Sequence, residues 1–250
     1  MTGKAPIRNN SRMGEARPDV EHEGPIRDAL QPLLDRFAAG EIDGAGFQAG
    51  LMEALKAMGT DTAFEPYARQ ALDGLQDVTV WRKDFGGRDV TVSMIYLHPG
   101  EVHPPHHHHN VTSVQIVVDG EVSGREFDRI RRMDERTLLL KPLFAGELPP
   151  GSLLLAHEWA RNAHWFAASR AAPALIWNCN ARGFEAQTFD LSDGRPLGRR
   201  LLRPEQTVSD GNILATEIGV AEAYETFGNM SPKDFVPAVS TPESIGSMLF

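Results

Sequence analysis

The chain has 250 residues, of which 41% are hydrophobic and 24% are charged, ordinary values for one large globular domain. Lysine and arginine total 25 against 34 aspartates and glutamates, and this net charge of −9 argues against nucleic acid or acidic lipid as a partner. No apolar run approaches the ~18 residues of a membrane span, and the N-terminus has no signal-peptide core.

The single cysteine, Cys179, cannot form an internal disulfide, and the sequence has no paired-cysteine zinc spacing. We therefore expect a cytoplasmic protein in which any metal is held by histidine, carboxylate or amide groups.

The first 76 residues divide into two parts. Residues 1–24 are polar and charged, which predicts a mobile tail that buries too little apolar surface to offset its ordering entropy. Residues 25–76 predict a helical extension because apolar side chains such as Ile26, Leu30 and Leu34 recur at helical spacing. This extension either forms a lid or dimerisation arm, or covers an exposed sheet edge.

The remainder of the chain changes in pattern. Between residues 77 and 190, short β-branched and aromatic runs separated by Gly, Pro and Asp predict an all-β sandwich or barrel. Residues 191–250 predict an irregular C-terminal extension that packs on this barrel, with one helix near residues 220–227. The expected strands are residues 78–84, 89–98, 112–119, 121–128, 137–144, 152–157, 163–168 and 173–180.

Histidine is concentrated in the middle of the sequence, with five of the nine histidines in residues 103–109. This run lies between two expected strands, where alternate residues point to opposite faces, so His106 and His108 share one face. On the concave interior of a barrel, two such imidazoles can converge on one cation, and a ligand from another strand completes the site. We expect His107 and His109 to point the other way, to a wet outer face or a position behind the ligands.

The histidine run resembles the first motif of the cupin superfamily, in which a glycine, His-x-His, a glutamate and a second glycine follow at set spacing. The matching residues are Gly100, His106, His108 and Gly120. The glutamate falls at Ser113, so this chain departs from the motif and lacks one usual metal ligand there.

The second cupin motif, which carries one more histidine on a later strand, is matched more loosely. Residues 151–156 resemble its opening strand and His164 resembles its histidine, while His157 competes for the same role. Over residues 78–182, the resemblance implies a double-stranded β-helix, or jelly-roll barrel, carrying the helical and C-terminal extensions.

The resemblance also implies a metal site formed by His106, His108 and His164. Three neutral imidazoles suit Fe(II) first, then Zn, Ni or Cu, whereas Mn prefers an added carboxylate. Some cupins with this ligand set, such as thiol dioxygenases, use iron with dioxygen. Around the metal, we expect contributions to substrate binding or catalysis from Gln115, Tyr96 and His157.

Three functions remain open at this point. The first is an Fe(II) dioxygenase or other oxygenase acting on a small organic substrate. The second is a lyase, isomerase or hydrolase that uses the metal as a Lewis acid. The third is a non-enzymatic cupin that binds a small ligand. The resemblance further implies a homodimer.

Overall fold

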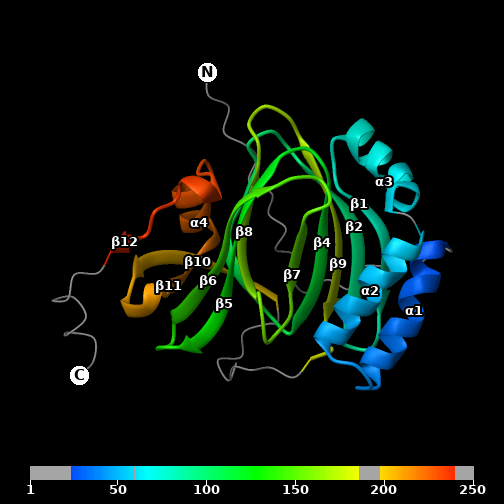
Figure 1. Cartoon of the computed structure of the whole chain (residues 1–250), viewed down its shortest axis with the longest axis horizontal. Helices are drawn as coiled ribbons and strands as arrows, with labels where there is room; N and C mark the ends of the chain where they lie inside the picture. Colours follow the sequence, from blue (N-terminus) through cyan, green and yellow to red (C-terminus); the bar gives the residue numbers. More distant parts are fainter. Residues whose placement is uncertain (1–23, 59, 186–197, 240–250) are drawn as a thin grey trace.

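A computed structural model describes residues 24–58, 60–185 and 198–239 of the chain (Figure 1). The tail predicted for residues 1–24 lies almost wholly outside these ranges. The helices are α1 (Pro25–Ala38), α2 (Gly44–Met58), α3 (Thr60–Gly74) and α4 (Val220–Phe227). The strands are β1 (Val78–Asp84), β2 (Asp89–Leu97), β3 (Val102–His109), β4 (Val111–Asp119), β5 (Val122–Arg132), β6 (Thr137–Leu148), β7 (Leu153–Ala156), β8 (Ala163–Ala168), β9 (Ala174–Arg182), β10 (Gly198–Thr207), β11 (Ile213–Ile218) and β12 (Ala238–Val239).

Two sheets face one another. The first has the order β1-β2-β9-β4-β7, and the second contains the order β6-β5-β8-β3. From β2 to β9 the chain crosses between the sheets at every connection except that of β5 to β6, and all neighbouring strands from β1 to β9 are antiparallel. This interleaved order is that of a double-stranded β-helix, so the predicted fold class is confirmed.

The helical extension covers one face of the first sheet (Figure 1). Its apolar side chains form one buried cluster with outward-facing residues of the strands, and Phe64 stacks on Trp177 with a centroid separation of 5.2 Å. Gln48 of α2 donates its side-chain amide to the carbonyls of Ser113 and Ala156, which joins this helix to β4 and β7. The extension therefore acts as the outer layer of the sheet.

Strand β3 was not among the strands expected from the sequence, because Pro104 and Pro105 lack the N–H donors that a central strand needs. The structure places both prolines at a register shift between His103 and His106, in the pairing of β3 with β8. The irregularity removes the need for their donors, so the strand continues through the histidines.

The C-terminal extension differs most from the prediction of an irregular segment. Strand β10 pairs with β3 and also with β11, and β11 pairs with β6. These pairings close a ring of six strands, β3-β8-β5-β6-β11-β10, on the far side of the second sheet from the helices. Figure 1 shows β10, β11 and α4 on this side. None of the helices in the described ranges is long and apolar enough to cross a membrane.

Candidate metal centre

Three histidines meet on the inner face of the second sheet. His106 of β3 lies directly opposite His164 of β8, and His108 follows two residues later on the same face. The nitrogen atoms that these rings offer lie within 4.8 Å of one another, and Nε2 of His108 is 3.3 Å from Nε2 of His164. The structure thus brings together the three residues that the sequence predicted as ligands.

One imidazole is held in a defined orientation by its own strand. Nδ1 of His106 lies 2.7 Å from the carbonyl oxygen of Pro104. A neutral ring that donates from Nδ1 has its lone pair on Nε2, so the backbone fixes the atom that is left for a ligand. The proline-containing bulge therefore has a second consequence, because it turns a carbonyl toward the ring.

The charge state of the rings also suits a metal ion. Burial, the neighbouring imidazoles and the Arg199 guanidinium hold the pKa of His106 and of His108 well below the usual histidine value. Burial and Arg199 lower the pKa of His164 to about 3. The rings are neutral at pH 7, as metal binding requires.

The spacing fits as well. Two nitrogens that each lie about 2.0 Å from one ion are about 3.3 Å apart when the angle at the ion is near tetrahedral. This is the observed separation between His108 and His164. Nδ1 of His164 is buried and has no hydrogen-bond partner within the described ranges. The residues present therefore fit a bound metal ion.

Polar side chains of the first sheet lie across from the histidines. Ser113 and Gln115 alternate with Val114 and Ile116, which face the helices, so their own side chains face the inside of the sandwich. Gln115 donates to Asn178 over 3.1 Å. Two side-chain oxygens here, the Ser113 hydroxyl and Oε1 of Gln115, are buried. Neither has a hydrogen-bond partner among the described residues. Such atoms indicate a polar occupant, such as substrate or water.

Glu126 of β5 is a member of this site that the sequence analysis missed. It lies directly opposite His164 in the pairing of β5 with β8 and is only 4% exposed. Its Oε2 accepts from Arg161 over 3.4 Å, whereas Oε1 is buried with no partner in the part of the chain described. Burial raises the pKa of this carboxyl group. Its place inside the predicted strand 121–128, together with strand parity, was the signal that was available.

Two residues predicted near the metal lie elsewhere. Tyr96 belongs to the buried cluster between the first sheet and the helices, so its ring is on the opposite face of β2 from the histidines. His157 lies in the turn between β7 and β8, where its Nδ1 is 4.0 Å from a carboxylate oxygen of Glu185. The structure does not bring either side chain to the three-histidine group.

The other face of β3 is buried inside the ring of six strands β3-β8-β5-β6-β11-β10, which we call the second ring. His107 and His109 are both 0% exposed, and Nη1 of Arg129 lies 3.2 Å and 3.1 Å from their Nδ1 atoms. Arg129 forms an ion pair with Glu158 at 2.8 Å, and Nε2 of His107 lies 3.2 Å from Glu217 of β11. The expectation of a wet outer face is wrong, because the unpredicted strands β10 and β11 cover it.

These two histidines and Glu217 form a second group whose ligand atoms lie within 4.8 Å of one another. A permanent cation already contacts both rings, because burial lowers the pKa of Arg129 only to about 10. Glu217 also pairs with Arg132 at 2.9 Å and with Arg200 at 3.3 Å. A metal ion here would have to sit beside these fixed positive charges, so we interpret this group as an ion-pair network.

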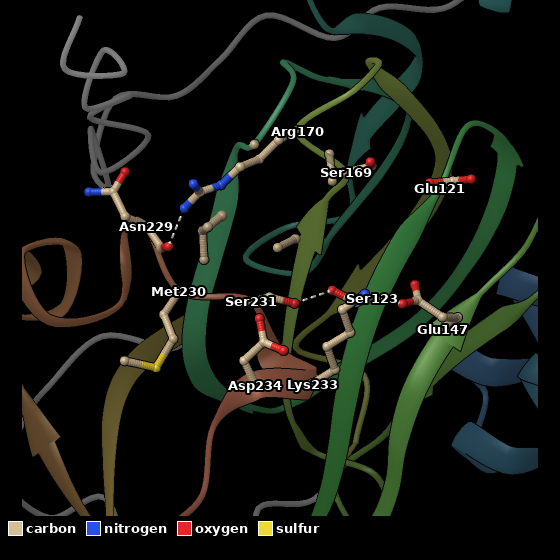
Figure 2. Close-up of a pocket in the computed structure, with 14 residues that line it drawn as sticks. Glu121, Ser123, Glu147, Ser169, Arg170, Asn229, Met230, Ser231, Lys233 and Asp234 are labelled. Atoms are coloured by element: carbon tan, nitrogen blue, oxygen red, sulfur yellow. Dashed lines mark hydrogen bonds and ion pairs between the residues drawn. The ribbon is translucent and has the colours of Figure 1, made fainter. Parts of the chain in front are cut away.

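A surface pocket lies apart from both groups of histidines, between the second sheet and the segment around residues 229–234 (Figure 2). Its polar side chains bond to neighbours: Arg170 donates to the carbonyl of Asn229, and the hydroxyls of Ser123 and Ser231 are 3.0 Å apart. It contains none of the three histidines and does not contribute to the candidate centre.

Comparison with known proteins adds structural similarity only. No family model matches the sequence, and no curated protein matches it. A solved oxalate oxidase is similar over 38% of this chain and 42% of its own, with 16% identity and a TM-score of 0.28. A sugar phosphate isomerase of the cupin superfamily from Silicibacter pomeroyi is similar over 38% of this chain and 60% of its own, with 18% identity and a TM-score of 0.29.

An 11S globulin from Wrightia tinctoria is also similar, with 13% identity and a TM-score of 0.29, over 37% of this chain and 20% of its own. The chain thus spans less than half the length of the globulin and of the oxalate oxidase. Because these scores are low, the fold assignment rests on the strand order. That order and the three convergent histidines define a cupin-type double-stranded β-helix with a candidate metal centre.

Proposed function

We propose that this chain is a metal-dependent enzyme that uses Fe(II), held by His106, His108 and His164, to oxidise a small organic substrate with dioxygen. The observation that carries the proposal is the convergence of three neutral imidazoles, of which His106 and His164 are buried and His108 is part-buried. A three-imidazole set suits Fe(II), and the position that would add a carboxylate in the cupin motif is Ser113.

The metal, when bound, supplies open coordination positions at which substrate and dioxygen can be activated. The chain supplies the surroundings. Apolar side chains including Leu97, Phe166 and Ile176 fill the adjoining part of the interior and exclude water from that side. Ser113 and Gln115 offer hydrogen-bonding oxygens that can orient a substrate.

Glu126 favours a second candidate, a lyase or isomerase in which the metal acts as a Lewis acid. A buried carboxylate whose second oxygen has no partner within the described residues is suited to accept a proton from a bound substrate. This chemistry needs no dioxygen, and zinc or nickel would serve.

Metal analysis and oxygen uptake separate the candidates. Protein purified without an affinity tag is analysed for metals, reconstituted anaerobically with Fe(II) or Zn(II), and tested with thiols, catechols and amines. Substrate-dependent oxygen consumption by the Fe(II) protein but not by the Zn(II) protein supports the oxygenase, whereas full turnover without oxygen supports the Lewis-acid enzyme. Failure to bind a stoichiometric ion contradicts both and favours a ligand-binding protein.

The variant His106→Ala is the matched test of the site, with His157→Ala as its control. The first removes a proposed ligand, and the second removes a part-buried imidazole outside both histidine groups. We expect only the first to abolish metal binding.

A further inference from the structure

The C-terminal extension contributes a cationic side chain to the face of the sheet that carries the three histidines. Strand β10 pairs with β3, with Arg199 directly opposite His108 and Leu201 directly opposite His106. Residues directly opposite in an antiparallel pair share a face, with Cβ atoms about 5 Å apart. Arg199 therefore lies beside the candidate metal centre.

The neighbouring arginine confirms this orientation. Arg200 lies opposite His107, and both reach Glu217 in the second ring, at 3.3 Å and 3.2 Å. Since successive residues of a strand point to opposite faces, Arg199 must point to the other side, toward the inside of the sandwich.

Arg199 also differs from its neighbours in its partners. Arg200 pairs with Glu217, and Arg203 on the same strand pairs with Glu205 and Glu222. In the described ranges, the Arg199 side chain has no hydrogen bond or ion pair, although it is part-buried. Its positive charge adds to burial in lowering the pKa of His164, which is consistent with its place near the ring.

We propose that Arg199 binds the carboxylate of a small organic acid that is the substrate of this site. This inference rests on the proposed function and names its substrate class. A guanidinium group presents a planar fork of donors that matches a carboxylate. A part-buried cation with no acidic partner among the described residues favours an anionic ligand.

The arrangement of charges on the sheet gives the substrate a direction. From β5 to β10, the inward-facing groups run from the Glu126 carboxyl, through the three imidazoles, to the Arg199 guanidinium. A substrate whose carboxylate is held at Arg199 therefore extends over the histidines toward Glu126. The reacting carbon then lies over the histidines, between the carboxylate held at Arg199 and the end of the substrate near Glu126.

The test measures binding of propionate and of propionamide, its neutral counterpart, to metal-free protein by ligand-observed NMR at constant ionic strength. We expect propionate to bind at least about tenfold more tightly than propionamide to the unaltered chain, because a hydrogen bond to a charged group is the stronger one. Arg199→Gln should weaken propionate to the level of the amide, and Arg199→Lys should retain part of the difference. Arg203→Gln, on the same strand but paired outside the site, should have no effect.

Equal binding of the two probes, or unchanged binding of propionate to Arg199→Gln, would overturn the proposal. Inorganic phosphate is the third probe, and tighter binding of phosphate than of propionate would also overturn it. Circular dichroism and Fe(II) content of Arg199→Gln separate this result from loss of the fold or of the metal. If the unaltered chain binds no metal but still binds propionate through Arg199, the proposed function fails and the carboxylate site stands.

Discussion

Consecutive histidines of β3 have different surroundings. His106 and His108 face the inside of the double-stranded β-helix, while His107 and His109 face the second ring and contact Arg129. Because successive side chains of a strand point to opposite faces, neighbouring residues of β3 belong to the candidate metal centre and to the ion-pair network in turn. Substitutions at adjacent positions should therefore have distinct effects.

His106→Asn and His107→Asn form a matched pair for this separation. We expect His106→Asn to weaken metal binding by at least about a hundredfold and to change stability little. His107→Asn should keep the metal but lower the free energy of unfolding by about 2 kcal/mol, because Glu217 and Arg129 each lose a buried partner. Metal analysis and urea unfolding measure the two effects, and loss of metal in both variants alike would contradict the separation.

Glu126 gives a second prediction at this scale. Its carboxyl group is buried with one half-exposed cationic partner, Arg161, so keeping it ionised costs folding free energy. We expect Glu126→Gln to raise the free energy of unfolding by about 1 kcal/mol and to lower kcat at least tenfold, with metal content unchanged. Glu147→Gln, which alters an exposed pair with Lys233, is the control. Unchanged kcat would show that Glu126 takes no part in the reaction.

At the scale of elements, the sequence predicted the strands whose apolar alternation is plain. Strands β1 and β8 have their predicted bounds, 78–84 and 163–168, and α4 lies at its predicted place. Strands β10 and β11 were not predicted, because the inward-facing positions of the second ring include Arg200 and Glu217. Their charges pair only when distant strands meet, and a pattern of single residues does not show this.

The candidate site was also predictable only in part. His106, His108 and His164 were found because a motif and strand parity pointed to them. Tyr96 was assigned to the wrong face: it shares the parity of Val90, Val92 and Met94, and this apolar face of β2 packs on the helices rather than lining the interior. Arg199 was not predictable before β10 was known to pair with β3.

Substitutions in the ion-pair network measure how much it contributes to the stability of the second ring. Arg129→Met leaves the Glu158 carboxylate buried without its ion-pair partner, and we expect a loss of about 3–5 kcal/mol in unfolding free energy. The double variant Arg129→Met with Glu158→Gln should recover part of this loss, as a double-mutant cycle would show. Arg131→Met, at an exposed position of the same strand, should stay within about 0.5 kcal/mol of the unaltered chain.

For the whole molecule, the buried histidines predict acid sensitivity. Burial lowers the pKa of His107 to about 4 and of His164 to about 3, so the unfolded chain, with histidine pKa values near 6.5, binds more protons at pH 5. Stability should fall as pH drops below about 6.5, by ~1.4 kcal/mol per pH unit for each such histidine, until the folded-state values are reached.

Urea unfolding between pH 7 and pH 5 measures this slope. A second loss should follow below pH 4.5, because His107, Arg132 and Arg200 outweigh burial and lower the pKa of Glu217 to about 2. A flat stability profile between pH 7 and pH 5 would contradict neutral, buried imidazoles. The homodimer implied by the resemblance stays a prediction, which light scattering of the full chain tests.

X-ray absorption spectroscopy of protein loaded with one equivalent of Fe(II) tests most directly whether His106, His108 and His164 hold one ion. We predict scattering from three imidazoles in the unaltered chain and in His157→Ala, and from two imidazoles in His164→Ala. Fewer than three imidazoles in the unaltered chain, or an unchanged spectrum in His164→Ala, would contradict the account.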